Sequence, residues 1–184
     1  MLPMSDPLRT HLATQLEATV ARRPHDEILH GVPPAARGGQ PDGLPEGYSL
    51  WQILEHMRIC QADYYRFCVD SDYTAPTWPD DYWPGAVAPP SDDAWTHSLN
   101  AFQRDLQLIK DLVNDSSIDL AGEIPHAEAV RTREGGASYH GNTYAEEIAA
   151  VADHNAYHLG QFVTVRRLLD VWPPETVEPP AWAP

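Results

Sequence analysis

Two histidines stand four residues apart in the segment His154-Asn155-Ala156-Tyr157-His158. On a helix this spacing places both side chains on one face, one turn apart, so their imidazoles can converge on one metal ion. No glutamate follows the first histidine, so the pattern of the helical metalloproteases is absent. Both histidines lie on an apolar stripe that we expect to face the core, where buried imidazoles need partners for their ring nitrogens. A metal ion is one such partner, and asparagine, tyrosine or backbone groups are the other.

His56 is the candidate third ligand, because it lies in another apolar stripe with Ile53, Cys60 and Phe67. Three inward-facing histidines from two helices form a site with positions open for water or substrate, which is typical of catalytic rather than structural metal sites. The alternative is a core histidine that hydrogen-bonds to a neighbouring helix.

The helices that must carry these residues are indicated by the positions of proline. The chain has 184 residues and 18 prolines, and the prolines are clustered. Since proline is costly inside a helix, the long intervals without it predict four helices. These intervals are 8–23, 46–75, 91–124 and 126–172. Pro24 can open a short continuation of the first helix.

Capping residues refine where these helices begin. Two pairs fit capping boxes, Ser49 with Gln52 and Thr143 with Glu146, and they predict the starts of two helices. We expect these helices to end near residues 71 and 169. Ser91, followed by two aspartates, begins the helix between them. The pattern is weak from 114 to 142, and the loop 75–90 is rich enough in aromatic residues to be packed.

The predicted fold is an all-α, antiparallel four-helix bundle with long proline-rich loops. We expect a single domain over 1–184, with a helical core at about 8–170 and a proline-rich tail at 171–184. The connection between the second and third helices is too long for an ideal bundle, which leaves the handedness open.

Charge and composition exclude several classes of partner. The formal net charge of −15 disfavours both nucleic acid and anionic membrane surfaces. No window is apolar enough for a membrane span, and no signal peptide is visible, so we expect a cytoplasmic protein. Cys60 and Cys68 are eight residues apart on one predicted helix, about 12 Å along its axis, which is too far for a disulfide.

Two segments make the chain resemble the DinB/YfiT-like superfamily. They are VADHNAYHLGQ at 151–161 and WQILEHMR at 51–58, and the resemblance extends over about residues 8–170. It implies a four-helix bundle with a three-histidine site for a divalent ion, often zinc or nickel. One ligand comes from the second helix and two from the fourth. On this chain the implied ligands are His56, His154 and His158.

The resemblance also implies a small-molecule substrate, because relatives include thiol-dependent S-transferases and a mycothiol-dependent isomerase. We therefore expect a divalent-metal-dependent enzyme, either a hydrolase or a transferase with a low-molecular-weight thiol as co-substrate. The alternative is a non-catalytic bundle, such as a homodimer, that binds a metal ion or a small ligand.

Other residues near these motifs have two interpretations each. His126 is a weak catalytic candidate, as a fourth ligand or proton shuttle, with a surface histidine as the alternative. Cys60, one turn after His56, either approaches the site or is a buried structural cysteine. His140 lies in a glycine-rich segment and is expected to be exposed.

The remaining polar residues of these segments are expected to play supporting roles. Glu55 and Asp153 immediately precede candidate ligands, so helix geometry turns each about 100° away, toward the surface or another helix. Gln161 can hydrogen-bond across the core or simply pack. Arg166 and Arg167 suit the negative end of the helix dipole.

Overall fold

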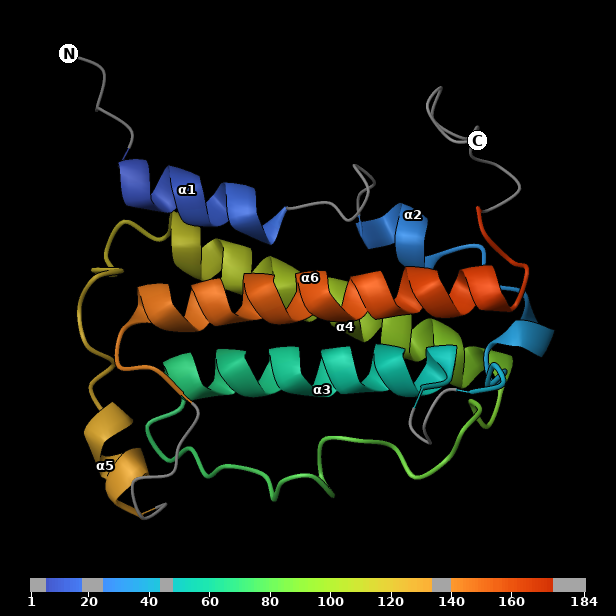
Figure 1. Ribbon diagram of the computed structural model, residues 1–184. Helices are drawn as coiled ribbons and strands as arrows, with labels where there is room; N and C mark the ends of the chain where they lie inside the picture. Colours follow the sequence, from blue (N-terminus) through green and yellow to red (C-terminus); the bar gives the residue numbers. More distant parts are fainter. Residues whose placement is uncertain (1–5, 18–24, 44–47, 134–139, 174–184) are drawn as a thin grey trace.

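The computed structural model describes residues 6–17, 25–43, 48–133 and 140–173. Within these ranges the chain is mostly helical and has no strand, with an isolated bridge between Glu123 and Thr143, which confirms the all-α class. In chain order the elements are α1 (Pro7–Leu16), α2 (His25–Leu29), the 3-10 helix η1 (Pro34–Ala36), α3 (Leu50–Val69), α4 (Asp92–Asn114), α5 (Ala127–Arg133) and α6 (Tyr144–Leu168) (Figure 1). None of the described helices has the length and apolar character needed to cross a membrane.

The helix starts agree with the capping patterns. Ser49 and Thr143 form complete capping boxes at the beginnings of α3 and α6, and the Ser91 side chain accepts the Ala94 backbone N–H at the start of α4. The short continuation of the first helix is α2, while residues 18–24 lie outside the described residues. Because these signals are local, they predicted the starts of the long helices to within about one residue.

Helices α3 and α4 run in the same direction. The Trp51 and Trp95 rings, near the two helix starts, have centroids 6.4 Å apart. Further along both helices, Gln61 Nε2 donates to the Phe102 carbonyl. The chain between them travels back along the length of α3 before α4 begins (Figure 1). The expected antiparallel arrangement is therefore wrong for this pair, because the long connection returns the chain to the end where α3 started.

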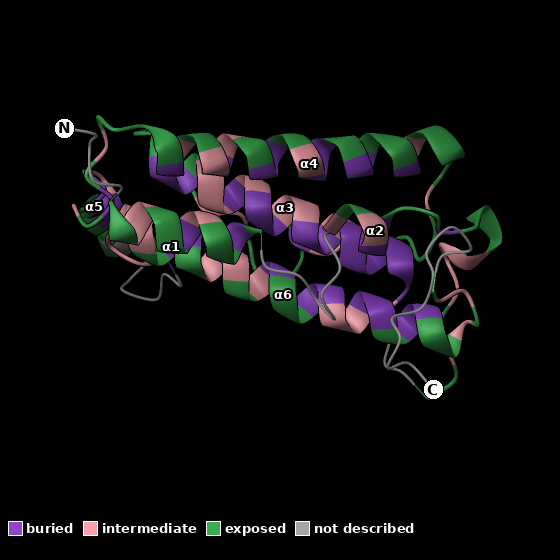
Figure 2. Ribbon diagram, turned by 90° about the horizontal axis from the view of Figure 1, so that it is seen from above, coloured by how far each residue is buried: buried purple, intermediate pink, exposed green. Residues whose placement is uncertain are grey.

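Helix α6 runs opposite to α3, and α1 runs opposite to α4. Gln61 of α3 accepts from Asn155 of α6, while His56, earlier in α3, packs against His158, later in α6. The Arg9 guanidinium at the start of α1 donates to a backbone carbonyl near the end of α4. Because α1 also packs against α6, helices α1, α3, α4 and α6 share one apolar core (Figure 2).

A second, smaller core lies at the end of α3. It joins that end to α5, which the weak pattern between 114 and 142 did not reveal. Its buried members are Phe67, Cys68, Tyr73, Ile124, Ala127 and Val130. Both cysteines are buried and free, as their spacing predicted.

Arg166 has a larger role than the helix-dipole interaction expected for it. Its side chain is fully buried. It donates to the backbone carbonyls of Ile28, His30, Gly31 and Val171. The guanidinium thus ties α6 to α2, to the residues just after α2 and to the chain that follows α6 itself.

Candidate metal centre

The structure brings the three predicted histidines together between α3 and α6. The ring centroid of His56 lies 5.1 Å from that of His154 and 4.6 Å from that of His158. The two rings of α6 are 4.4 Å apart. The helical spacing of four and the antiparallel packing of α6 on α3 together produce this convergence.

Burial keeps these imidazoles neutral. It lowers the pKa of His154 to about 3 and that of His158 to about 4, with a further lowering from the neighbouring imidazoles. Burial also lowers the pKa of His56, against the effect of its hydrogen bond to the Tyr82 carbonyl. Neutral imidazole is the form that binds metal ions, so the donor set suits a divalent ion at neutral pH.

Hydrogen bonds set which nitrogen of each ring is free. His56 Nδ1 donates to the Tyr82 carbonyl at 2.9 Å, and His158 Nδ1 donates to Gln161 Oε1 at 2.7 Å. Each ring therefore keeps its lone pair on Nε2. His154 Nε2 lies 3.2 Å from His56 Nε2 and donates to it, so an ion held between these two nitrogens would displace that proton. Gln161 thus acts as the orienting partner of His158.

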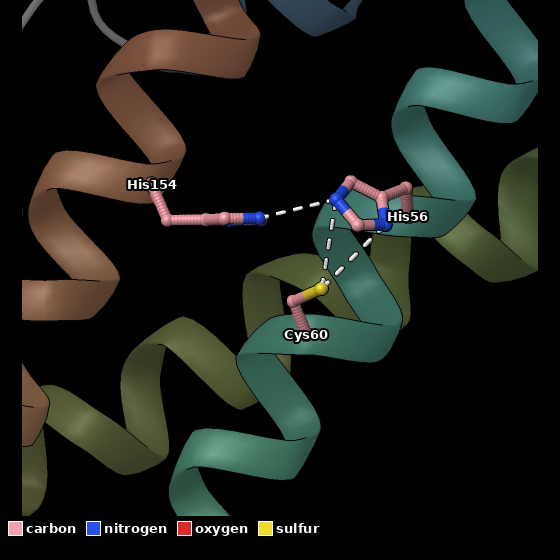
Figure 3. A group of neighbouring side chains, drawn as sticks. All are labelled: His56, Cys60 and His154. Carbon is pink, nitrogen blue, oxygen red and sulfur yellow. Dashed lines mark hydrogen bonds between the residues drawn. The ribbon is translucent and has the colours of Figure 1, made fainter. Parts of the chain in front are cut away.

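Cys60 adds a sulfur donor to the same place. Its Sγ lies 3.6 and 3.7 Å from the two ring nitrogens of His56. The ligand atoms of His56, Cys60 and His154 all lie within 4.8 Å of one another, and this group could hold a metal ion (Figure 3). Burial and Asp63 raise the pKa of the Cys60 thiol to about 12, so the thiol binds a metal only if the ion displaces its proton. Of the two interpretations of Cys60, the structure supports the one in which it approaches the site.

The histidines open into a pocket with a volume of about 690 Å³. Its described lining is mainly aromatic and consists of His56, Cys60, Tyr64, Trp78, Tyr82, Ala150, Asp153, His154, Tyr157 and His158. The Trp83 ring stacks on the His56 ring, with centroids 3.8 Å apart and planes 6° from parallel. The aromatic loop between α3 and α4 is therefore packed against the site, as its composition suggested.

Asp63 anchors this loop at two points. Its Oδ1 accepts from the Tyr73 hydroxyl at 2.9 Å, and its Oδ2 accepts from the Tyr82 hydroxyl at 2.7 Å. All three side chains are buried. Because the Tyr82 carbonyl also accepts from His56 Nδ1, the anchor fixes the partner that orients a candidate ligand.

His140 is buried beside this anchor, which corrects the expectation that it is exposed. The residue is only 5% exposed, and its ring stacks on Phe67 with centroids 4.0 Å apart. Nδ1 donates to Glu147 Oε2 at 2.7 Å, and Nε2 lies 2.9 Å from the Tyr73 hydroxyl. Since that hydroxyl gives its proton to Asp63, it accepts from His140, so both ring nitrogens carry protons.

The charge on His140 follows from its neighbours. Burial alone would lower its pKa, but the hydrogen bonds to Asp63 and Glu147 outweigh burial and raise the pKa to about 9. The sequence contains a signal for these acids: Asp63 follows His56 by seven residues, and Glu147 precedes His154 by seven. Residues seven apart share a helix face, so both carboxylates continue the inward stripes that carry the candidate histidines.

Of the other candidates, His126 and Glu55 are not among the described residues that line the histidine pocket, whereas Asp153 lines it. His126 Nε2 donates to the Phe67 carbonyl at 2.6 Å, at the far end of α3, about 16 Å along the axis from His56. It is not among the described residues that line the pocket. Glu55 forms two hydrogen bonds with Arg58, and Asp153 is exposed at the pocket.

No family model, no curated protein and no solved structure matches this chain.

Proposed function

We propose that this protein is a divalent-metal-dependent enzyme with a DinB/YfiT-like four-helix bundle, in which His56, His154 and His158 hold the ion. The observation that carries the proposal is the convergence of three neutral imidazoles, from α3 and α6, beside a pocket of about 690 Å³. Ligands from only two helices leave one side of the site facing the pocket, where a small molecule can reach it.

The chain's own groups supply orientation and binding. A zinc or nickel ion would act as a Lewis acid that lowers the pKa of a water or thiol in the pocket. The Tyr82 carbonyl and Gln161 orient two of the imidazoles. The aromatic lining, which includes Trp78 and Tyr157, offers apolar surface to a substrate. Transfer to a small electrophile from a low-molecular-weight thiol and hydrolysis of a small molecule both fit this arrangement.

A second candidate is a non-catalytic metal-binding protein, and the position of Cys60 favours it. Cys60 forms one compact group with His56 and His154, and a further ligand from His158 would complete the four ligands that are typical of structural zinc sites. The two candidates therefore differ in whether sulfur is a ligand.

Metal analysis of protein purified without an affinity tag tests the site. We expect about one equivalent of a divalent ion in the wild type and a loss of at least about tenfold in affinity in His158→Ala. His11→Ala, which removes an exposed histidine of α1, is the matched control and should bind like the wild type. Absence of stoichiometric metal, or equal binding by His158→Ala, would contradict the three-histidine site.

Cobalt substitution separates the two candidates. A thiolate ligand gives an intense ultraviolet charge-transfer band that disappears in Cys60→Ser, and this result would support the closed structural site. If the band is absent and Cys60→Ser keeps its metal, the open site is supported. Turnover is then tested with a thiol-plus-electrophile panel and a panel of hydrolysable esters and amides, each with and without chelator. No chelator-sensitive turnover in either panel would leave the non-catalytic candidate.

A further inference from the structure

The pocket exposes large aromatic surfaces beside the histidines. Trp78 is 63% exposed and Tyr157 is 62% exposed, and both line the pocket. The Trp78 ring centroid lies 5.5 Å from that of Tyr82 and 6.3 Å from that of His56. Solvent-exposed aromatic surface gathered at a concave site is typical of a ligand-binding site.

The hydroxyl groups of the two tyrosines are already hydrogen-bonded to protein side chains. The Tyr82 hydroxyl is turned away to Asp63, and the Tyr157 hydroxyl accepts from Gln161 Nε2 at 3.1 Å. Trp78 adds an indole ring, which has the most favourable face for a cation. Faces of Trp and Tyr attract ammonium groups through the ring quadrupole, so the wall suits an organic cation as well as an apolar group.

The charge of the lining residues favours a cationic ligand over an anionic one. Among the described lining residues, Asp153 is the one carboxylate, and none is lysine or arginine. Arg58, on the same helix as His56, is held by Glu55 at 2.7 Å. The whole chain carries −15. An anionic ligand would therefore find no cationic side chain among the described lining residues, whereas a cation finds a carboxylate in a chain of strongly negative net charge.

We propose that the part of the pocket formed by the exposed residues Trp78, Tyr157 and Asp153 binds the ammonium group of an organic cation with an apolar body. This assignment names the substrate class of the site described above. It rests on the proposed function only for the direction in which the remainder of the ligand points, toward the histidines.

The test compares choline with 3,3-dimethylbutan-1-ol, its neutral isostere, in which carbon replaces the charged nitrogen. Both probes are titrated into the full chain after dialysis against a chelator. Binding is followed by proton NMR of the nine equivalent methyl protons, which aromatic rings shift upfield. We expect choline to bind about fivefold more tightly than the alcohol, since one cation–π contact contributes about that factor.

Variants assign the preference to particular residues. Trp78→Leu keeps an apolar side chain but removes the ring face, so it should weaken choline about fivefold and the alcohol by less than twofold. Asp153→Asn should weaken choline only, and more so at low salt. Asp111→Asn, an exposed aspartate on α4 outside the pocket lining, is the matched control and should leave both affinities unchanged.

Three results would overturn the cation assignment: no upfield shift of the choline methyl protons, equal affinity for the two probes, or an equal loss of both in Trp78→Leu. The last two indicate a plain apolar site. Because these titrations need no metal ion, their failure is distinguishable from failure of the metal analysis, which would contradict the proposed function and leave the choline result standing.

Discussion

Raising the pH from 6.5 to 8.5 is expected to lower the free energy of unfolding by about 2 kcal/mol through His140 alone. Contacts with Asp63 and Glu147 raise the pKa of His140 from its ordinary 6.5 to about 9. A group with a raised folded-state pKa stabilises the protein fully below its unfolded pKa, and the effect is lost as the pH rises through the folded pKa. The difference corresponds to about 3 kcal/mol in total, of which about 2 are lost by pH 8.5.

Urea unfolding followed by circular dichroism at pH 6.5, 7.5 and 8.5 measures this effect. The wild type should lose stability across the series, and His140→Gln should start lower and lose about 2 kcal/mol less. His11→Gln, which changes an exposed histidine, should follow the wild type. Burial also raises the pKa of Cys60 and Cys68 above their ordinary 9.0, but their effect on stability begins near that pH and is shared by His140→Gln.

A wild-type stability that is constant from pH 6.5 to 8.5 would refute the charged state of His140. Parallel decreases in the wild type and His140→Gln would refute it equally, because the loss would then come from other groups. If His140→Gln does not fold, NMR titration of the wild-type His140 ring replaces the comparison. A midpoint near the ordinary 6.5, rather than about 9, then rejects the assignment.

Three further predictions concern other parts of the fold. After chelation, the free energy of unfolding should fall as the pH drops below 6.5. In the unfolded chain the imidazoles take up protons, whereas in the folded protein His154 and His158 stay neutral down to about pH 3 and 4. Urea midpoints at pH 6.5, 5.5 and 4.5 measure this fall, and equal midpoints would contradict it. Arg166→Met should lower the free energy of unfolding by about 2–4 kcal/mol, because it leaves buried carbonyls without donors. Arg167→Met, at an exposed position of the same helix, should change it by less than about 0.5 kcal/mol in the same urea assay. Ser49→Ala should cost about 1 kcal/mol through loss of the α3 cap, and an unchanged urea midpoint would show that the cap is dispensable.

Local signals in the sequence were sufficient for the starts of the long helices and for the grouping of the histidines, although they did not reveal α5. A capping box such as Ser49 with Gln52 acts within four residues, so no tertiary information is needed to place a helix start. The pairing of His154 with His158 follows from the helical period alone. His56 joined them because its apolar stripe required α3 to pack on the same core.

The features that the sequence did not reveal depend on contacts between distant segments. The shared direction of α3 and α4 follows from the path of a long connection, whose anchor on Asp63 joins residues 10 and 19 positions apart. His140 lies in a glycine-rich segment, which predicts exposure. Its buried position depends on contacts of its ring nitrogens with Asp63 of α3 and Glu147 of α6, two separate helices. Arg166 looked like a helix-end cation because its carbonyl partners, apart from that of Val171, lie more than 130 residues earlier.

The anchor on Asp63 also bears on how the pocket binds a ligand. Tyr82 could leave the pocket wall only by breaking its hydrogen bond with a buried carboxylate and its contact with His56 Nδ1. Leaving buried polar groups unpaired costs about 1–3 kcal/mol each, and more for a charged group, so the wall is held in place before any ligand arrives. A pre-formed wall spares the ligand the cost of ordering the loop. Tyr82→Phe should therefore weaken choline binding even though it keeps the aromatic ring, because it releases the anchor rather than the contact surface.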